Sequence, residues 1–312
     1  KHKSVLGSSY TQKGRSGFRG KGSCLLHRKG EKQMQPLELY IHIPFCVKKC
    51  AYCDFLSGPA GEKEKEEYVK MLVDEIRNCP DTVQNYRGIS IFFGGGTPSL
   101  LTGEQIGRLM DTVREIFTLD EDAEITMEMN PGTVTEEKLR KYRQAGVNRL
   151  SIGLQSVNDE ELRLLGRIHT YEEFLEAYHL ARANGFANIN VDLISAIPGQ
   201  TVESWRRTLE QVMALFPEHI SAYSLILEEG TTFYKKYVED EAKEGPKLPD
   251  EDAERQMYWD TETLMEKNGY HRYEISNYAK EGYACRHNLG YWERIPYLGF
   301  GIGAASLVPG DL

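Results

Sequence analysis

Short apolar segments alternate with amphipathic helical segments along most of the chain, and this alternation restricts the fold more than any other feature. The apolar segments, rich in β-branched residues, are 39–43, 89–93, 124–129, 149–154, 188–194 and 219–225. Between them, apolar residues at helical spacing predict helices, for example over 106–117 and 174–181. Because repeated strand–helix–strand units build a parallel sheet, the sequence predicts an α/β fold.

Local signals mark the ends of the predicted helices. Thr102 with Gln105 and Thr170 with Glu173 each form a capping box, in which two side chains satisfy backbone groups at the start of a helix. After a charged stretch, a further helix is expected at about 250–267. The helical segments therefore carry their own start signals, as the alternation requires.

Polar and glycine-rich segments recur directly after the predicted strands. They are 94–98, 128–133, 153–156 and 198–201. In a barrel, the carboxyl ends of all strands point to one face and converge on one site. A doubly wound sheet instead concentrates its ligand contacts at a single switch point. The recurrence therefore favours a partial (β/α)6 TIM-like barrel over a doubly wound sheet.

Three regions are expected along the chain. Residues 1–36 hold nine Lys and Arg residues against one acidic residue, with many Gly and Ser residues, and predict a basic disordered tail. A transit peptide is the alternative for this tail, since such peptides are rich in Arg and Ser and poor in acids. Residues 37–230 are expected to form the barrel core, and 231–312 an accessory C-terminal region that looks truncated.

Composition excludes several classes of protein. A net charge of −9 argues against a general nucleic-acid-binding protein. No apolar run approaches the roughly 18 residues of a transmembrane helix, so a cytoplasmic protein is expected, with mitochondrial targeting by the basic tail as the alternative. Six cysteines in 312 residues do not suggest a disulfide scaffold. Because three of them cluster within eight positions, they indicate metal binding or redox chemistry.

The clustered cysteines are Cys46, Cys50 and Cys53, in the spacing C-x3-C-x2-C directly after a predicted strand. Thiolates favour zinc, copper(I) or iron–sulfur clusters. A structural zinc site normally takes four protein ligands, so His42 or His287 would have to complete it here. A [4Fe–4S] cluster on three cysteines instead leaves one iron open to an outside ligand. The pattern favours the cluster, with a Cys3His zinc site and buried core thiols as alternatives.

The same spacing is the signature of the radical SAM superfamily, where SAM is S-adenosylmethionine, and the chain resembles this superfamily from about residue 37 to 306. The main matching segment is YIHIPFCVKKCAYCDF at 40–55. Others are GGGTPS at 94–99, EMNPGT at 128–133, SIGLQS at 151–156, DLISAIPGQT at 192–201 and HNLGYW at 287–292. Together they resemble the branch that contains oxygen-independent coproporphyrinogen III oxidase and the HemW heme chaperones.

This resemblance implies a [4Fe–4S] cluster on the three cysteines and a SAM site beside it. Glycines after the second strand would let SAM approach the backbone, because a side chain there would block it. The residues that match the family's SAM contacts are Tyr40, Tyr52, Gly95, Gly96, Thr97, Glu128, Gln155, Arg167 and Asp192. Each also has an ordinary interpretation; Arg167, for example, could be a solvated helix residue and Glu128 a carboxylate at the barrel rim.

Two features separate the branches within the family. The oxidase branch carries a fourth cysteine two positions after the third, where this chain has Phe55 and HemW-like proteins have an aromatic residue. HemW-like proteins also share an HNxxYW segment, which here supplies His287, Asn288, Tyr291 and Trp292. Histidine is a common axial ligand of heme iron, and Tyr and Trp pack well on flat rings. The resemblance therefore implies heme contact by this segment; the plainer interpretation is that His287 caps a loop and Trp292 belongs to the core.

The resemblance implies a heme chaperone that transfers heme to acceptor proteins and houses a SAM-binding cluster. The alternatives are oxidative decarboxylation of coproporphyrinogen III and a radical SAM reaction on another substrate. Expected partners are heme, acceptor proteins and a small reducing protein such as flavodoxin or ferredoxin, with an encounter at a membrane surface as a further option and no nucleic acid. Two positions depart from the family pattern: Ala196 stands where glycine is usual, and Ala305 where histidine is common.

Overall fold

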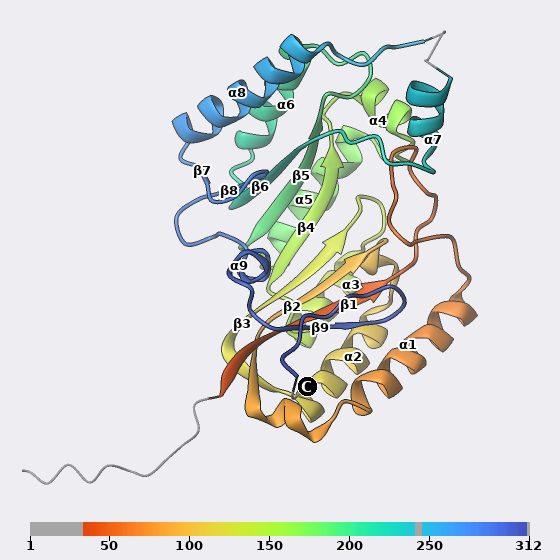
Figure 1. The fold of residues 1–312 in the computed structure, drawn as a ribbon, viewed down its shortest axis with the longest axis vertical. Coiled ribbons are helices and arrows are strands. Elements are labelled where there is room, and N and C mark those ends of the chain that lie inside the picture. The colour runs from red at the N-terminus through yellow and green to blue at the C-terminus, as the bar shows by residue number, and fades with distance from the viewer. Residues whose placement is uncertain (1–33, 241–244, 311–312) are drawn as a thin grey trace, which may run out of the picture. The chain divides into compact units, whose positions relative to one another are not determined.

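The computed structural model describes residues 34–240 and 245–310, and within them the six predicted strands form one parallel arrangement (Figure 1). They are β1 (Gln35–Ile43), β2 (Tyr86–Gly95), β3 (Thr118–Met129), β4 (Arg149–Gln155), β5 (Ile189–Ser195) and β6 (His219–Ser224). Each of β2 to β6 pairs with the strand that precedes it in the chain. β1 begins two residues inside the predicted basic tail, and residues 1–33 of that tail lie outside the described residues.

Three short strands that the sequence did not predict extend both edges of this sheet. β9 (Tyr297–Phe300) pairs parallel to β1, while β8 (Asn277–Ala279) pairs antiparallel to β6 and β7 (His271–Arg272) antiparallel to β8. Among the described residues the strand order is β7-β8-β6-β5-β4-β3-β2-β1-β9, with β7 and β9 at the two ends. The sheet is therefore an open, partial barrel, which confirms the predicted fold class. The added strands come from 231–310, so the boundary predicted at 230 does not separate two sheets.

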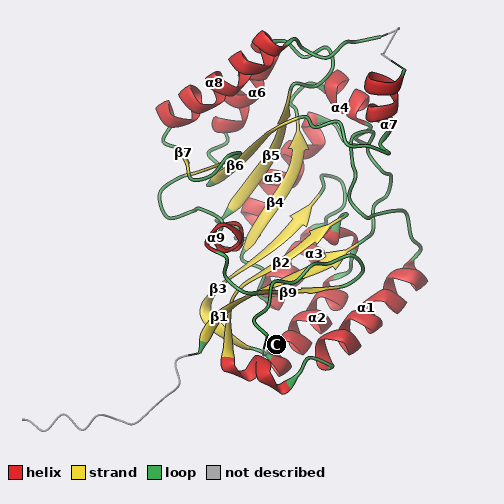
Figure 2. Cartoon of the chain, in the orientation of Figure 1, coloured by secondary structure: helices red, strands yellow, loops and turns green. Residues whose placement is uncertain are grey.

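Helices connect the strands, and one later helix lies on the opposite face of the sheet. The α-helices are α1 (Glu62–Arg77), α2 (Gly103–Ile116), α3 (Glu136–Ala145), α4 (Asp159–Leu165), α5 (Tyr171–Ala183), α6 (Val202–Met213), α7 (Thr232–Tyr234), α8 (Glu251–Lys267) and α9 (Arg286–Glu293). The shorter helical turns are η1 (Asp81–Asn85), η2 (Pro98–Leu100) and η3 (Lys235–Glu239). In Figure 2, α2, α3 and α5 lie behind the strands, whereas α9 lies in front of them.

The predicted helix signals are present in the structure. The Thr102 hydroxyl accepts a hydrogen bond from the Gln105 backbone N–H, and the Gln105 side chain closes the box at the start of α2. Thr170 and Glu173 do the same at the start of α5. The helix expected at about 250–267 is α8. Capping side chains close in the sequence thus define where α2 and α5 begin.

The core lies between the sheet and its outer helices. All seven residues of β4 are buried, as expected for a central parallel strand that is covered on both faces. On α6, Trp205 is fully buried and its Nε1–H donates to the Thr261 hydroxyl of α8, at 2.9 Å. This hydrogen bond gives the only polar atom of the indole ring a partner, which a buried tryptophan requires. It also ties α8 to the barrel.

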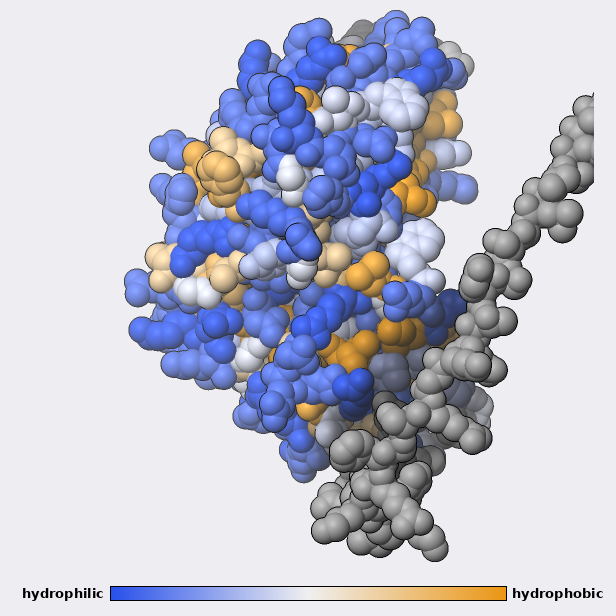
Figure 3. Space-filling model, turned by 90° about the vertical axis from the view of Figure 1, so that its left-hand side faces the viewer, coloured by the Kyte–Doolittle hydropathy of each residue, from blue (hydrophilic) through white to orange (hydrophobic). Residues whose placement is uncertain are grey.

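The face of the molecule drawn in Figure 3 is mainly hydrophilic. Figure 3 shows one face, on which apolar residues form separate patches among hydrophilic ones. Within 34–240 and 245–310, none of the helices combines the length and the apolar character that crossing a bilayer needs.

Candidate functional site

The three clustered cysteines lie on one loop, residues 44–58, which follows β1 and is here called the cysteine loop. Its two ends are joined, because the Cys46 N–H donates to the Gly58 carbonyl at 2.9 Å and the Gly58 N–H donates to the Pro44 carbonyl at 3.0 Å. Between them, the Cys53 N–H donates to the Cys50 carbonyl at 3.3 Å. All three cysteine residues are partly exposed. The sequence spacing thus becomes a closed loop that presents three accessible thiols at the end of a strand.

One side of the cysteine loop rests on the glycine-rich segment after β2. The Gly96 N–H donates to the Ile43 carbonyl at 2.9 Å, and the Thr97 N–H to the Phe45 carbonyl at 2.7 Å. A Cβ atom on Gly96 would lie 2.6 Å from the Phe45 carbonyl oxygen, so only glycine permits this approach. The Thr97 hydroxyl lies 3.6 Å from the Cys46 sulfur.

The other side of the loop meets the segment that follows α4. The Ala51 N–H donates to the Leu165 carbonyl at 2.9 Å, and Arg167 Nη1 donates to the Cys50 sulfur at 3.8 Å. Arg167 Nη2 donates to Asn130 Oδ1 and to the Gly153 carbonyl, both at 2.6 Å. Arg167 is therefore held by several partners, and its guanidinium places positive charge beside a thiol. The interpretation of Arg167 as a solvated helix residue was wrong.

The two histidines that could complete a zinc site are both engaged elsewhere. His42 is hydrogen-bonded through Nδ1 to the Tyr40 hydroxyl at 3.1 Å and through Nε2 to the Leu56 carbonyl at 2.9 Å. His287 is hydrogen-bonded to Ser90 and Tyr291. In the described part of the chain, no three His, Cys, Asp or Glu side chains are arranged to hold a single ion. The thiols of a cluster bind different irons and need not meet at one point, so this donor set fits an iron–sulfur cluster better than zinc.

Two acidic residues matched to SAM contacts line the barrel interior, and both are partly buried. Glu128 accepts a hydrogen bond from the Gly95 N–H at 3.0 Å, and burial, with repulsion from Asp192, raises its pKa to about 8. Burial also raises the pKa of Asp192, although its carboxylate accepts hydrogen bonds from Asn190 and Ser151. Glu128 is therefore mainly protonated at neutral pH and can donate a hydrogen bond.

Backbone conformation is unusual at three positions around the same strand ends. Gly95 has φ +110°, and a Cβ there would lie 2.4 Å from the His42 ring. Gln155, at the end of β4, has φ +77°, and Ala196, just after β5, has φ +59°. Non-glycine residues in this region carry strain of about 1–2 kcal/mol. Ala196 therefore adopts a conformation that explains why glycine is usual there.

The residues matched to heme contacts all lie on α9 but differ in their exposure to solvent. His287 is 2% exposed, stacks on Phe92 with ring centroids 5.2 Å apart, and is hydrogen-bonded through Nδ1 to Ser90 Oγ (2.8 Å) and through Nε2 to the Tyr291 hydroxyl (3.0 Å). Burial lowers its pKa to about 3. Trp292 is 56% exposed and so does not belong to the core. The segment presents Trp292 to solvent and His287 to the barrel interior.

The barrel interior contains a cavity of about 160 Å³. Residues matched to SAM contacts and residues matched to heme contacts both line it. Tyr40, Glu128 and Asp192, matched to SAM contacts, line it together with His287, Asn288 and Tyr291 of α9. Sequence reasoning missed other polar residues in its wall, namely Arg149, Ser151, Asn190, His219, Ser221, Tyr273 and Asn277. Their signal was the presence of polar residues inside otherwise apolar strands, for instance the Arg that opens β4.

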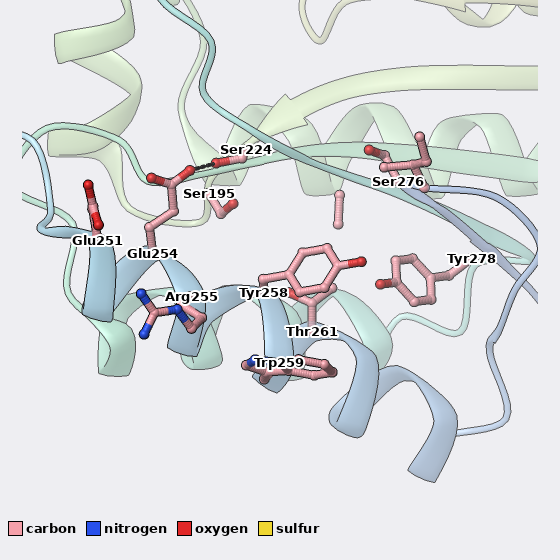
Figure 4. A pocket seen from close by; sticks show the side chains of 12 residues that line it. Ser195, Ser224, Glu251, Glu254, Arg255, Tyr258, Trp259, Thr261, Ser276 and Tyr278 are labelled. Atoms are coloured by element: carbon pink, nitrogen blue, oxygen red, sulfur yellow. Dashed lines mark hydrogen bonds between the residues drawn. The ribbon is translucent and has the colours of Figure 1, made fainter.

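A second cavity, of about 450 Å³, lies between α8, the end of β6 and the segment before β8. Its walls are partly aromatic, from Tyr258, Trp259 and Tyr278 (Figure 4). Glu251 and Glu254 also line it, and Glu254 accepts a hydrogen bond from the Ser224 hydroxyl at 2.5 Å. None of the residues singled out in the sequence lies in this cavity.

The chain is similar to known proteins both in sequence and in structure. Residues 40–212 match the radical SAM superfamily. The chain is 44% identical to the heme chaperone HemW of Escherichia coli strain K12, over 88% of this chain and 71% of that protein, and 39% identical to HemW of Bacillus subtilis strain 168, over 87% and 71%. It is also similar to the solved coproporphyrinogen III oxidase HemN of Escherichia coli, a radical SAM enzyme, with a TM-score of 0.76 and 29% identity over 88% of this chain and 65% of that one.

Replacing Gly96 with Ala tests the contact that holds the cysteine loop. The new Cβ would meet backbone atoms of Ile43 and Phe45, which cannot move aside as a side chain can. We expect Gly96→Ala to lower the free energy of unfolding by about 1–3 kcal/mol, measured by urea denaturation.

Gly58→Ala is the matched control, because a Cβ on Gly58 meets nothing within 4 Å although the residue closes the same loop. Its unfolding curve should stay close to that of the wild type. A Gly96→Ala protein as stable as the Gly58→Ala protein would contradict the proposed close packing.

Proposed function

Because the chain belongs to the radical SAM superfamily and, within it, to the family of the heme chaperone HemW, we propose that it binds heme and transfers it to acceptor proteins. The observation that carries this proposal is the similarity to several HemW proteins over most of the chain. Phe55 supports it, since the oxidase branch carries a fourth cysteine at this position. As a radical SAM protein, the chain carries a [4Fe–4S] cluster and binds SAM.

Cys46, Cys50 and Cys53 are the proposed ligands of the cluster. A [4Fe–4S] cluster held by these three cysteines would leave one iron free for an outside ligand such as SAM and could supply an electron there. Support comes from the accessible thiols on a closed loop and from Arg167, whose cation would offset negative charge on the thiolates. Thr97 adds a hydroxyl beside the Cys46 sulfur.

The proposed SAM contacts divide into backbone and side-chain groups. Gly95 and Gly96 are proposed on the family resemblance, and in the structure their N–H groups donate to Glu128 and to the Ile43 carbonyl. Tyr40 and Tyr52 are proposed as aromatic contacts on the same resemblance. Glu128 offers a mainly protonated carboxyl group to polar parts of SAM. Asp192 offers a carboxyl group that already accepts a hydrogen bond from Ser151. Gln155 and Arg167 complete the set at the end of β4 and after α4. These roles rest on the family resemblance together with burial and hydrogen bonding.

Heme contact by the segment 287–292 is proposed on two different grounds. Trp292, with Tyr291 at 41% exposure, supplies aromatic surface that a porphyrin face can cover. His287 is a candidate axial ligand, but its ring would first have to release Ser90 or Tyr291, because both ring nitrogens are hydrogen-bonded. Asn288 donates to the Tyr273 hydroxyl at 3.2 Å and holds α9 against the cavity wall.

The proposed function implies binding partners and a location in the cell. A heme chaperone binds heme and the proteins that accept heme from it, so these are the first proposed partners. A small reducing protein such as flavodoxin or ferredoxin would supply the cluster's electron, and the exposed Lys48 and Lys49 on the cysteine loop would suit an acidic partner. A cytoplasmic location is proposed, with mitochondrial targeting as the alternative.

The similarity to HemN supports the alternative, an oxidase of coproporphyrinogen III. One activity assay separates this alternative from the proposed heme chaperone. We expect the reconstituted protein to form no protoporphyrinogen IX from coproporphyrinogen III under anaerobic conditions with SAM and a reductant. Sustained product formation, measured by porphyrin fluorescence after oxidation, would make the chain an enzyme of the oxidase type.

Each cluster ligand is testable alone. Because two thiolates do not replace three, we expect Cys46→Ala, Cys50→Ala and Cys53→Ala to abolish [4Fe–4S] assembly after anaerobic reconstitution with iron and sulfide. Iron content, sulfide content and visible absorption measure the cluster. Cys79→Ala is the control, since Cys79 lies beyond α1 and outside the cysteine loop, and it should assemble the cluster normally. A wild-type protein that takes up zinc but no cluster would overturn the assignment.

Heme contact is tested by comparing two exposed tryptophans. We expect Trp292→Ala to weaken heme binding in an absorption titration without changing stability, because Trp292 is exposed on α9. Trp259→Ala is the matched control, since Trp259 is 55% exposed but lies on α8, and it should bind heme as the wild type does. If His287 ligates the iron, His287→Ala changes the heme spectrum. Equal heme affinity in both tryptophan variants would argue against heme contact by this segment.

A further inference from the structure

Arg149 is a buried cation in the interior cavity that none of the proposed ligand contacts uses. It is the first residue of β4, is 2% exposed and lines the cavity. Its Nε–H has no hydrogen-bond partner within the described residues. Glu124 and Asp192 act on it electrostatically, but neither forms an ion pair with it in the part of the chain that the structure describes. A buried guanidinium with unused donors is unfavourable unless an acceptor is supplied.

The neighbouring polar side chains of the cavity wall, in contrast, satisfy one another. Asn190 Nδ2 donates to Asp192 Oδ1 and to the Ser151 hydroxyl, each at 2.7 Å. His219 is hydrogen-bonded to Asn190 Oδ1 at 2.6 Å and to the Tyr273 hydroxyl at 2.8 Å. Because this network is complete without Arg149, the arginine is not needed to hold the wall together.

A second unpaired group lies beside Arg149. Thr126 of β3 is its register partner in the sheet, and the buried Thr126 hydroxyl also lacks a hydrogen-bond partner within the described residues. Thr126 is not among the residues that line the cavity, so the inference rests on Arg149.

Among the described residues that line the cavity, Arg149 carries the positive charge. Burial lowers the pKa of His219 well below its ordinary value, so its ring is neutral at neutral pH. Glu128 is mainly protonated there as well, since its pKa is about 8. Arg149 is therefore the cation of this cavity wall, and the acids that act on it, Glu124 and Asp192, form no ion pair with it among the described residues.

The cavity's size limits what can reach Arg149. A volume of about 160 Å³ is below the roughly 300–1,000 Å³ of sites that enclose a whole drug-sized ligand, but it accepts a side arm. Tyr223 and Tyr291, each about two-fifths exposed, form part of the wall near the surface. The larger cavity beside α8 suits a carboxylate less well, because Glu251 and Glu254 line it (Figure 4).

We propose that Arg149 binds a carboxylate group of an organic ligand whose arm enters this cavity. A guanidinium pairs with a carboxylate through two parallel hydrogen bonds, which gives both affinity and orientation. The inference rests on the proposed function, which supplies two ligands with carboxylates, namely heme through its propionates and SAM through its amino-acid part.

The test compares each ligand with an analogue that lacks the carboxylate. Wild type, Arg149→Met and Arg149→Lys are reconstituted anaerobically and titrated with heme, heme dimethyl ester, SAM and decarboxylated SAM. We expect Arg149→Met to weaken one carboxylate-bearing ligand by about tenfold or more and its analogue by less than about twofold. If heme and its dimethyl ester show this difference, Arg149 binds a heme propionate. If SAM and decarboxylated SAM show it, Arg149 binds the SAM carboxylate. Arg149→Lys should lie between, because lysine keeps the charge but not the two-pronged geometry.

The control variant is Arg140→Met, which removes an exposed arginine on α3 and should leave all four affinities unchanged. Equal weakening of acid and analogue, or no weakening of either acid, would overturn the inference. If Arg149→Met does not fold, the same comparison with Arg149→Lys decides. A wild-type protein that binds no heme would refute the chaperone proposal, and the SAM pair would still test Arg149.

Discussion

Backbone hydrogen bonds from Gly96 to Ile43 and from Thr97 to Phe45 hold the cysteine loop against the end of β2, and the candidate site depends on them. They continue the pairing of β1 with β2 beyond the strands themselves. Since a Cβ on Gly96 would collide with the Phe45 carbonyl, the glycine-rich segment is a steric condition for the position of the thiols. The Ala51–Leu165 hydrogen bond fixes the opposite side of the loop. These backbone contacts therefore place the cysteines at the end of β1, beside the segment that follows β2.

Burial controls the charge inside the barrel. The interior disfavours ions, so the pKa of Glu128 rises to about 8 and the pKa of His287 falls to about 3. Arginine cannot respond in this way, because its guanidinium stays protonated in proteins. The same desolvation that neutralises the acid and the histidine thus leaves Arg149 charged. A buried polar wall of this kind distinguishes ligands by charge more than by shape.

Local patterns predicted much of this fold, and contacts between distant segments account for what they missed. The six central strands and the capping boxes at Thr102 and Thr170 follow from apolar spacing and side-chain chemistry within a few residues. The edge strands β7, β8 and β9 are two to four residues long, too short to show a period, and form only because a neighbouring strand offers unpaired backbone groups. The cysteine spacing indicated a metal centre directly. Arg149 carried only the weaker signal of a charged residue at the start of an apolar strand, because the folded sheet alone shows that it lines the cavity.

The position of α9 joins two sites that the sequence presents as separate. Gly290 allows the helix to approach β1, where a Cβ would lie 2.2 Å from a Glu38 carboxyl oxygen. Ser90 then bridges the two elements, donating to Glu38 at 3.0 Å while it is hydrogen-bonded to His287 at 2.8 Å. His287, proposed for heme, consequently shares a cavity with Glu128, proposed for SAM. If both proposals hold, a ligand that draws His287 away from Ser90 would also change the cavity wall beside Glu128.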